Sequence, residues 1–428
     1  MPANVIPGTK IFGDASADAL RAVAGSAHVR PAGAGDAVAG VQPGIVVEPG
    51  SEQELAAVLR YANQAGLSVA PCGGGTKLSW GNPPKRLDLI VSTARLDRVV
   101  EHAWADLTVI VEAGCTIQRL QETLAQRRQR LALDPLWPEH ATIGGVLSTN
   151  DSGALRLRFG GLRDLIIGMT LALPDGTLAV SGGKVVKNVA GYDLPKLATG
   201  ALGTLGVITR AIFRLHPLPQ CTMTLSLSAR SLSEAQRFIA AVQDSQLAHS
   251  ALQIRAGDDL PPEADVLFEC VQAGLAAQEM HLRKLAAPNC LARADGAVWK
   301  ARERLWGSPE NATIAKISVL PAEIVRAIEI IELTAPEQAI RWRAVMQATG
   351  VGWLRLDGAA EGLHALLLKL RARLERDGGS LQVLRQPAGM PRLDAWGNAG
   401  NALPLMVALK KEFDPKDSLN HGRFVGGI

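Results

Sequence analysis

The sequence predicts an α+β protein with two domains of different character. Many of its 43 glycines lie between Gly73 and Gly206, where short apolar runs alternate with helical patterns. After Pro217-Leu218-Pro219 glycines become rare, and helices with charged faces follow. In that second part a β-α-β-β-α order occurs twice, which is typical of one antiparallel sheet covered by helices. We therefore expect a glycine-rich domain followed by an α+β domain with a single antiparallel sheet.

Length and composition fit this division. With 428 residues, of which 47% are apolar and 20% charged, the chain has enough material for two or three folded cores. We expect an N-terminal extension over residues 1–39, the glycine-rich domain over 40–218, the α+β domain over 219–402 and a closing segment over 403–428.

Charge and residue spacing exclude several classes of protein. The 45 Lys and Arg against 41 Asp and Glu give a net charge of only +4, which argues against nucleic-acid binding. No apolar stretch approaches the roughly 18 residues of a membrane span, and the first residues lack a signal-peptide pattern. The five cysteines show no C-x-x-C spacing, and no two of the eight histidines are spaced as metal ligands. We expect a cytoplasmic protein without disulfides, a metal or an iron–sulphur cluster of its own.

The glycine-rich domain opens with a β-α-β unit. A short apolar strand over 45–47 precedes Ser51 and Glu54, which form a capping box at the start of a helix. Apolar residues at helical spacing follow until Gly66, and 67–70 is the next strand. Further strands are expected at 87–91, 108–112, 166–173, 178–181 and 206–215.

The α+β domain repeats one order of elements. The first copy has a strand over 222–228, a helix opened by the capping box of Ser231 and Glu234, strands over 252–255 and 266–271, and a helix over 275–285. The second copy has a strand over 313–319, a helix opened by Pro321, strands over 341–346 and 352–356, a helix over 363–374 and a strand over 381–384. Residues 293–311 are expected to link the copies.

Three glycine-rich loops lie beside predicted strands. They are Gly73-Gly74-Gly75-Thr76, Thr142-Ile143-Gly144-Gly145 with the following 149–153, and the segment 200–209. Consecutive glycines after a strand leave backbone amides open to an anion. One such loop is more often an ordinary turn, but three in one domain favour a dinucleotide site. No G-x-G-x-x-G opens a helix, and Gly183-Lys184 lacks the Ser or Thr of a P-loop, so neither of those sites is indicated.

These loops and their surroundings resemble the FAD-binding family of vanillyl-alcohol oxidase and p-cresol methylhydroxylase (PCMH). The most specific match is the block over 182–209, which contains the run Lys-Asn-Val-Ala-Gly-Tyr-Asp-Leu at 187–194. Shorter matches lie at 71–77, 111–114, 143–145 and 413–424. The likeness is strong over about residues 40–218, and within the family the chain is most similar to the FAD-binding subunits of bacterial glycolate oxidase (glycolate dehydrogenase) complexes.

The resemblance implies a two-lobed PCMH-type FAD-binding domain, an α+β cap domain and a closing segment that returns to the FAD domain. Thr76 stands where covalently flavinylated members carry His, so we expect noncovalent FAD. Val at Gly74 or Gly203 is expected to block the cofactor and leave the fold intact. The implied cofactor-binding residues are Pro71, Cys72, Gly73, Gly74, Gly75, Thr76, Lys77, Gly114, Ile143, Gly144, Gly145, Asn150, Ser152, Gly153, Lys187, Gly191, Tyr192, Asp193, Gly203, Gly206, Val207, Ile208, Asn420 and Arg423.

Two of these residues have alternative readings from their chemistry alone. Lys187 would offset negative charge on phosphate or reduced flavin, or it is a solvated lysine. Cys72 is more simply a small buried thiol than a reactive one.

The resemblance also implies an FAD-dependent oxidoreductase that takes part in oxidising glycolate or D-lactate to the 2-oxo acid. The implied partners are a second flavin subunit and an iron–sulphur subunit that receives the electrons, with association at the inner face of the cell membrane through that complex. Two alternatives stay open: a structural FAD-binding partner without substrate chemistry of its own, and a stand-alone FAD-dependent alcohol oxidase.

No catalytic base is assigned. Related 2-hydroxy-acid dehydrogenases carry a histidine-rich motif late in the cap domain, and the matching residues here, 350–358, contain no histidine. His140 is a candidate group near the flavin, although a structural hydrogen bond is the simpler role. Arg355 and Arg423 are candidates for a substrate carboxylate, for pairing with acids or for contact with FAD phosphate.

Overall fold

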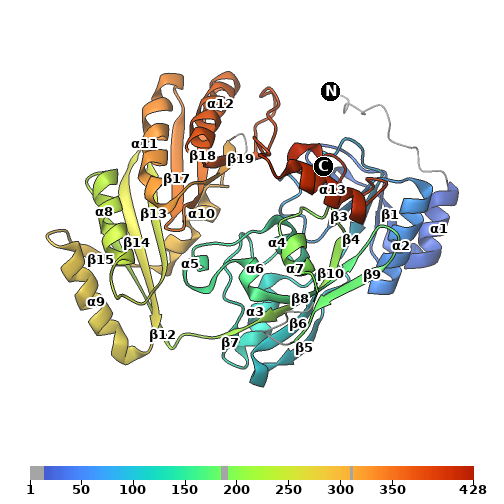
Figure 1. Cartoon of the computed structure of the whole chain (residues 1–428), viewed down its shortest axis with the longest axis horizontal. Helices are drawn as coiled ribbons and strands as arrows, with labels where there is room; N and C mark the ends of the chain where they lie inside the picture. The colour runs from blue at the N-terminus through green and yellow to red at the C-terminus, as the bar shows by residue number, and fades with distance from the viewer. Residues whose placement is uncertain (1–13, 185–190, 309–311) are drawn as a thin grey trace. The chain divides into compact units, whose positions relative to one another are not determined.

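The computed structural model describes residues 14–184, 191–308 and 312–428 (Figure 1). These residues divide into two compact units. Unit 1 contains the described residues up to Ser152, Gly161–Pro217 and Ala399–Ile428, and unit 2 contains Gly153–Gly160 and Leu218–Asn398. The main boundary after Pro217 lies beside the predicted position at 218. The short segment 153–160, which the sequence analysis placed in the first domain, belongs to unit 2.

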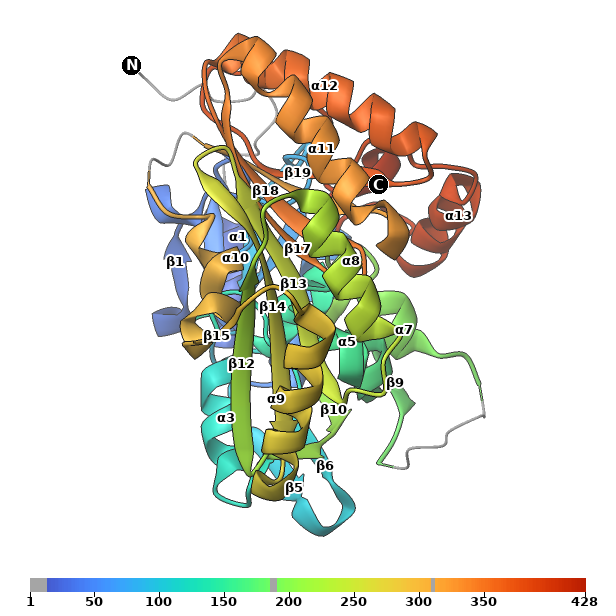
Figure 2. The ribbon, with the colours of Figure 1, turned by 90° about the vertical axis from the view of Figure 1, so that its left-hand side faces the viewer.

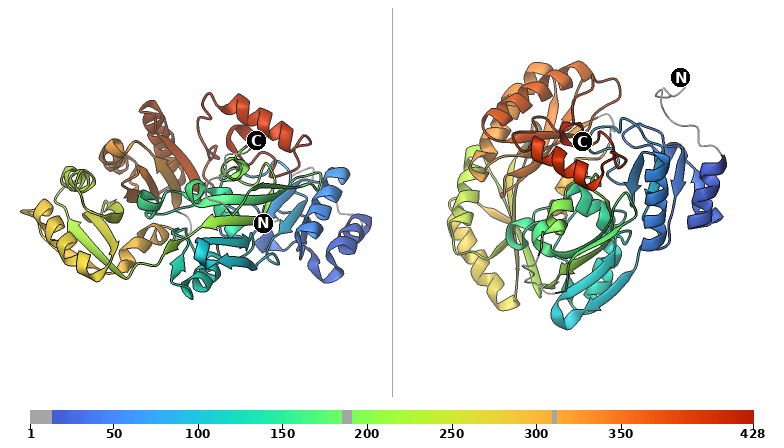
Figure 3. Two further views of the ribbon diagram at one scale, coloured as in Figure 1. Left: turned by 60° about the horizontal axis from the view of Figure 1, so that its bottom comes forward. Right: turned by 45° about the vertical axis from the view of Figure 1, so that its right-hand side comes forward.

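The first lobe of unit 1 is a four-stranded sheet with two helices on one face (Figure 3). Its strand order is β1 (Val29–Pro31), β2 (Ile45–Val47), β4 (Leu89–Ser92) and β3 (Val69–Cys72), with β2, β4 and β3 parallel and β1 antiparallel to β2. The helices are α1 (Asp14–Ala24) and α2 (Glu52–Ala65). Apolar residues of both helices, such as Leu20 and Leu59, pack against alternate residues of the strands.

Capping sets the bounds of α2. The Ser51 Oγ accepts the amide of Glu54 at 3.1 Å, as the capping box requires. The Glu54 carboxylate reaches one residue further back than expected and accepts the amide of Gly50 at 2.7 Å. Gly66 ends the helix in the left-handed conformation with φ 65°. The helix therefore has the start and end that the sequence predicts.

The second lobe of unit 1 is a five-stranded antiparallel sheet. Its order is β5 (Val99–Ala103), β6 (Thr108–Glu112), β10 (Val207–Arg214), β8 (Ile166–Ala172) and β9 (Leu178–Gly182). The core on this sheet includes residues of α3 (Ile117–Ala125) and α4 (Ile143–Thr149). Unit 1 also holds the paired strands β7 (Gln129–Arg130) and β11 (His216–Pro217) and the helices α6 (Leu162–Leu165), α7 (Leu194–Ala198) and α13 (Leu403–Phe413).

Unit 2 is built on one eight-stranded antiparallel sheet (Figure 2). The order is β15 (Leu291–Ala294), β12 (Cys221–Ser228), β14 (Leu260–Cys270), β13 (His249–Gly257), β17 (Arg341–Gln347), β18 (Val351–Asp357), β16 (Thr313–Ser318) and β19 (Ser380–Arg385). The two halves mirror each other about the pair β13–β17, and the same order of elements recurs in each half. The predicted α+β domain with a single antiparallel sheet is confirmed.

Helices cover one face of this sheet. They are α8 (Leu232–Gln243), α9 (Gln272–Ala286), α11 (Ile324–Thr334) and α12 (Ala360–Arg376), and the short helices α5 (Arg156–Phe159) and α10 (Ala301–Arg304) complete the unit. The core between sheet and helices takes alternate strand residues such as Trp342, Ala344 and Met346. None of the helices among the described residues has the length and apolar character needed to cross a membrane.

The closing segment runs back along the first lobe. The amide of Val69 donates to the carbonyl of Ser418 at 2.7 Å, and the amide of Asn420 donates to the carbonyl of Val69 at 2.8 Å. The segment thereby lies parallel to β3 at Val69 and Leu419. This pairing brings Asn420 and the residues after it to the carboxyl end of β3, where the first glycine loop begins.

Candidate functional site

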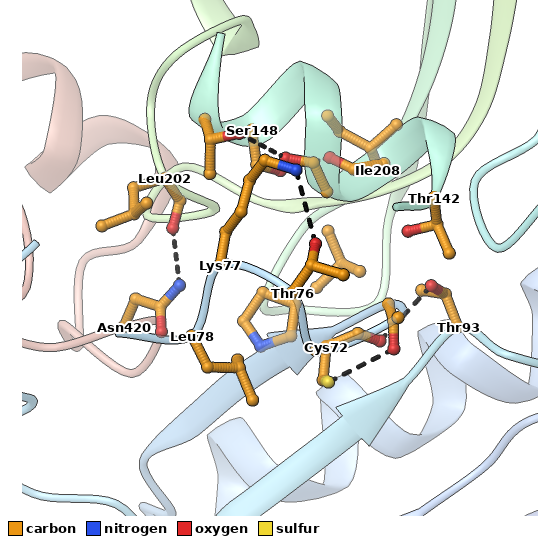
Figure 4. A pocket seen from close by; sticks show the side chains of 18 of the residues that line it. Cys72, Thr76, Lys77, Leu78, Thr93, Thr142, Ser148, Leu202, Ile208 and Asn420 are labelled. Carbon is orange, nitrogen blue, oxygen red and sulfur yellow. Dashed lines mark hydrogen bonds between the residues drawn. The ribbon is translucent and has the colours of Figure 1, made fainter. Parts of the chain in front are cut away.

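A pocket in unit 1 lies where the three glycine-rich loops meet (Figure 4). Its walls come from the end of β3 and the loop after it, from the start of α4 and from the segment before β10. It brings together Pro71, Cys72, Gly73, Gly74, Gly75, Thr76, Lys77, Gly144, Gly145, Gly206, Val207, Ile208, Asn420 and Arg423. Leu78, Thr93, Thr142, Ser148, Thr149 and Leu202 also line it.

The other residues that the resemblance implied have different places. Gly114 and His140 line a separate hollow beside the first loop. Tyr192 is 92% exposed and does not line the pocket. Of the remaining residues, Ile143 and Ser152 are buried and Gly191 is exposed. Asn150 ends α4, Asp193 begins α7, and Gly153 belongs to unit 2. Gly203 packs against Pro71. Lys187 lies outside the described residues.

Glycine is needed at several loop positions because neighbouring protein atoms leave no room for a Cβ. A Cβ on Gly74 would lie 1.8 Å from the carbonyl oxygen of His140, and one on Gly206 would lie 2.6 Å from the Leu171 Cγ. Gly203 has φ 69°, and a Cβ there would lie 2.8 Å from the Pro71 Cγ. The expectation that Val at Gly74 or Gly203 leaves the fold intact is therefore corrected: a side chain at either position would strike the protein itself.

The charge of the lining favours an anionic ligand. Lys77 and Arg423 are cationic and buried, and among the lining residues that the structure describes there is no carboxylate. The hydroxyl oxygen of Thr142 is buried in the same wall and has no hydrogen-bond partner in the described part of the chain. A buried polar atom of this kind is normally satisfied by a ligand or water. The pocket thus fits a ligand that carries phosphate groups.

Arg423 holds the first loop in place from the closing segment. Its guanidinium donates to the carbonyls of Leu78 at 2.8 Å and Trp80 at 2.7 Å, and to the Asn420 side-chain oxygen at 3.2 Å. Burial lowers the pKa of Arg423 to about 10, which still leaves it charged at neutral pH. Because these N–H groups donate to oxygens of the protein, the main role of Arg423 is to hold the first loop in position and to place a positive charge beside it.

Lys410 fixes the other side of the pocket. Its ammonium group donates to Asp414 at 2.7 Å, to the carbonyl of Thr204 at 2.9 Å and to the carbonyl of Leu419 at 2.9 Å. The Asn420 side-chain amide donates to the carbonyl of Leu202 at 2.6 Å, as Figure 4 marks. The closing segment therefore holds the third glycine loop through two side chains. The sequence analysis missed Lys410, although its spacing of four residues from Asp414 was a visible signal.

The thiol of Cys72 is not suited to reaction. Burial raises its pKa to about 11, so it stays protonated at neutral pH. This agrees with the interpretation of Cys72 as a small buried group.

In unit 2, Arg355 is occupied by the protein. Its guanidinium donates to both carboxylate oxygens of Asp357, at 2.7 and 2.8 Å, and to the carbonyls of Leu305 and Gly307. Of the alternatives for Arg355, pairing with an acid is the one observed. Within the described ranges no group of three or more His, Cys, Asp or Glu residues is arranged to hold a metal ion.

Comparison with known families identifies FAD as the cofactor that this pocket binds. A family model described as an FAD binding domain matches residues 43–182. Unit 1 contains an FAD binding domain. The matched residues include the first two glycine loops. The third loop and the closing segment lie beyond the matched residues in the sequence, but they line the same pocket. The prediction of FAD as the cofactor is confirmed.

Two curated relatives share the region of the FAD binding domain. The D-lactate dehydrogenase of Archaeoglobus fulgidus is 33% identical over 204 residues, which are 47% of this chain and 45% of that protein. The glycolate oxidase subunit GlcD of Bacillus subtilis is 28% identical over 211 residues, which are 49% of this chain and 45% of that protein. The chain thus spans less than half the length of either relative. Both names denote oxidoreductases, in agreement with the expected class of enzyme.

The fold extends beyond the FAD binding domain to the whole chain. The structure of p-cresol methylhydroxylase with substrate bound matches with a TM-score of 0.76 and 13% identity, covering 99% of this chain and 98% of that one. At this identity the likeness speaks for the fold alone. It confirms the predicted PCMH-type architecture, with an FAD-binding domain and an α+β second domain.

FAD should dissociate from the protein intact. Thr76, which stands where the resemblance implies a histidine in covalently flavinylated members, lines the pocket. Acid precipitation of the purified, FAD-loaded protein is therefore expected to release all flavin into the supernatant, measured by its absorbance. Flavin retained in the washed pellet would contradict noncovalent binding.

Proposed function

We propose that the chain is the FAD-binding subunit of a 2-hydroxy-acid dehydrogenase complex that oxidises glycolate or D-lactate to the 2-oxo acid. The observation that carries the proposal is the FAD binding domain with its cationic, glycine-lined pocket, together with the oxidoreductases that share this region. The relatives are named for D-lactate and glycolate, both small 2-hydroxy acids, which supports that substrate class.

The residues of the pocket have clear tasks in such an enzyme. The backbone of the first loop, Lys77 and the Thr142 hydroxyl would hold FAD, and Val207 and Ile208 supply an apolar wall. FAD, when bound, supplies an acceptor for the hydride that leaves the carbon bearing the hydroxyl group. Arg423 and Lys410 keep the loops in position from the closing segment.

Partners are part of the proposal because electrons must leave the flavin after each turnover. We propose a second flavin subunit and an iron–sulphur subunit, with the complex at the inner face of the cell membrane. Two features support this: the five cysteines lack the C-x-x-C spacing of cluster ligands, and residues 350–358 lack the histidine-rich metal and base motif that the resemblance implies for active 2-hydroxy-acid dehydrogenases.

Purification of the tagged chain from its native host in mild detergent tests the proposal. A second flavoprotein and a C-x-x-C-rich iron–sulphur protein are expected to copurify. Added glycolate or D-lactate should then bleach the flavin absorbance of the recovered complex in the absence of oxygen. Acetate, which has the carboxylate but no hydroxyl group, is the control and should have no effect. Recovery of the chain alone with full oxidase activity towards oxygen would contradict the complex.

A further inference from the structure

Two cysteines of unit 2 face each other across a pair of neighbouring strands. Cys221 is the first residue of β12 and Cys270 is the last residue of β14, and the antiparallel pairing places these two residues directly opposite each other. They continue the row that contains the opposed pair Met223 and Phe268, on the face of the sheet that packs against the helices. The two thiols therefore project from the same face of the sheet.

The backbone holds the two residues at a distance that suits a disulfide. Directly opposed residues of antiparallel strands have Cα atoms about 4.5 to 5.5 Å apart. Disulfides join residues whose Cα atoms lie about 4.4 to 6.8 Å apart. The register of β12 and β14 ends at Cys221 and Cys270, so the backbone can adjust there as the sulfur atoms approach each other. A bond between them needs no rearrangement of the sheet.

Both thiols are within reach of a small reagent. Cys221 and Cys270 are each partly exposed, whereas Cys115 is buried. The Sγ of Cys221 donates to the side-chain oxygen of Gln272 at 2.9 Å, and a Cβ on Gly274 would lie 3.7 Å from the Sγ of Cys270. Gln272 and Gly274 belong to the first turn of α9, which lies along β12 and β14 (Figure 2). The two sulfur atoms thus lie beside the same turn of helix.

The remaining cysteine of unit 2 lies far from this pair. Cys290 is exposed and directly precedes β15, whose Leu291 is opposite Leu227 of β12. Leu227 lies six residues along the strand from Cys221, which corresponds to about 20 Å. Cys290 is therefore a single accessible thiol in the same unit, and it serves as an internal control for the reactivity of the pair.

The reduced pair is stable until an oxidant arrives. Burial and the neighbouring Cys221 raise the pKa of the Cys270 thiol, and the nearby charge of Arg158 only partly opposes them. Cys270 therefore stays protonated at neutral pH. Because the thiolate is the form that reacts, oxidation of the pair should be faster in mildly alkaline buffer than at neutral pH.

We propose that Cys221 and Cys270 form a reversible disulfide when the protein meets hydrogen peroxide. One thiolate attacks the O–O bond of the peroxide and becomes a sulfenic acid, and the released oxygen leaves as water. The other thiol then attacks this sulfur, the S–S bond forms, and the hydroxyl group leaves as a second water. Two electrons pass from the sulfur atoms to the peroxide, and both thiol protons end in the two waters.

The bond fastens the place where the chain enters unit 2. Unit 2 takes up the chain again at Leu218, shortly before Cys221, so the disulfide ties the start of β12 to the end of β14. It closes a loop of about 50 residues, which restricts the unfolded chain and stabilises the folded unit. The inference concerns unit 2 alone and stands whether or not the substrate is a 2-hydroxy acid.

Peptide mapping of the purified FAD-loaded protein tests the bond. The protein is treated with a small excess of hydrogen peroxide, its remaining thiols are blocked, and it is digested without reductant. Mass spectrometry is expected to find the peptides of Cys221 and Cys270 joined to each other, and dithiothreitol should separate them. The oxidised protein should melt about 5 to 10 °C higher than the reduced protein in the transition of unit 2.

Three single variants show which thiols are responsible. Cys290→Ser is the matched control and should keep both the joined peptides and the rise in melting temperature. Cys221→Ser and Cys270→Ser should lose both effects. In each of these two variants the remaining cysteine has no partner, so it should proceed to sulfinic or sulfonic acid under the same treatment.

Three results would overturn the proposal. The first is oxidation of Cys221 and Cys270 in the unaltered protein to separate sulfinic or sulfonic acids without joined peptides. The second is joining of Cys290 to either residue as often as they join each other, which would show random oxidation. The third is a disulfide between Cys221 and Cys270 that leaves the melting temperature of unit 2 unchanged.

Discussion

A Gly74→Ala variant is expected to lose FAD and to melt at a clearly lower temperature. The added Cβ would lie 1.8 Å from the carbonyl oxygen of His140 and 2.9 Å from its carbon, so one of two backbone segments must move. Forcing atoms into a packed site costs about 3 kcal/mol. In a domain of this size that is a drop in melting temperature on the order of 10 °C. The displaced loop is the one that begins the FAD pocket, so stability and cofactor are lost together.

Gly183→Ala is the matched control for this change. A Cβ on Gly183, just after β9, meets no atom of the described residues within 4 Å, and its backbone is not left-handed. Its melting temperature and flavin content should equal those of the unaltered protein. The two measurements are calorimetry and the ratio of flavin to protein absorbance. A Gly74→Ala protein with full flavin content would show that the loop and His140 can separate without cost.

Lys410→Met is expected to release the closing segment from the FAD pocket. The substitution leaves the carboxylate of Asp414, which is fully buried, without its cation. Removing one partner of a buried ion pair costs about 3–5 kcal/mol. The carbonyls of Thr204 and Leu419 lose their donor at the same time. The third glycine loop should then loosen, and FAD affinity should fall along with the free energy of unfolding.

Neighbouring residues provide the controls for Lys410. Lys411 is exposed, so Lys411→Met should leave both stability and FAD affinity unchanged. The double variant Lys410→Met/Asp414→Asn should be less unstable than the sum of its single changes, because the uncompensated charge is gone. Urea unfolding gives the free energies, and flavin fluorescence gives the affinity. Additive effects in the double variant would argue against a coupled ion pair.

Elements with a regular pattern and a buried face could be predicted from the sequence. The strand expected over 108–112 is β6, and the alternating run expected over 206–215 is β10, which is shorter by one residue at each end. The capping serines, Ser51 and Ser231, both accept the amide three residues on. In these places local preference and tertiary packing favour the same structure, so short-range reasoning is sufficient.

Two edge strands, β1 and β5, were missed because they carry weaker signals than the edge strands β9 and β19, which were predicted over 178–181 and 381–384. β5 lies at the edge of its sheet, and each of its residues is at least partly exposed, so the sequence shows no apolar alternation. β1 is also an edge strand and ends in Pro31. Edge strands tolerate polar residues and proline because only one side is paired.

The site was predictable in its loops and not in its side-chain partners. The glycines stood out in the sequence, but the reason for them at Gly74, the nearby His140 carbonyl, is a contact across the fold. The pairing of Lys77 with Asp151 likewise joins residues from two different loops. Such contacts follow from tertiary arrangement, which the composition of either loop does not reveal.

The way the closing segment completes unit 1 sets an order of events during synthesis. Asn420 and Arg423, which line the FAD pocket, leave the ribosome after all of unit 2. Domains generally fold as units while the chain emerges. Unit 2 has its full set of residues by Asn398 and can fold on the ribosome, whereas the strand-like pairing of Val69 with Leu419 must wait until Leu419 has been made. Cofactor loading is therefore expected to follow the synthesis of unit 2, and a nascent chain stalled before Lys410 would carry a folded second unit and an open flavin site.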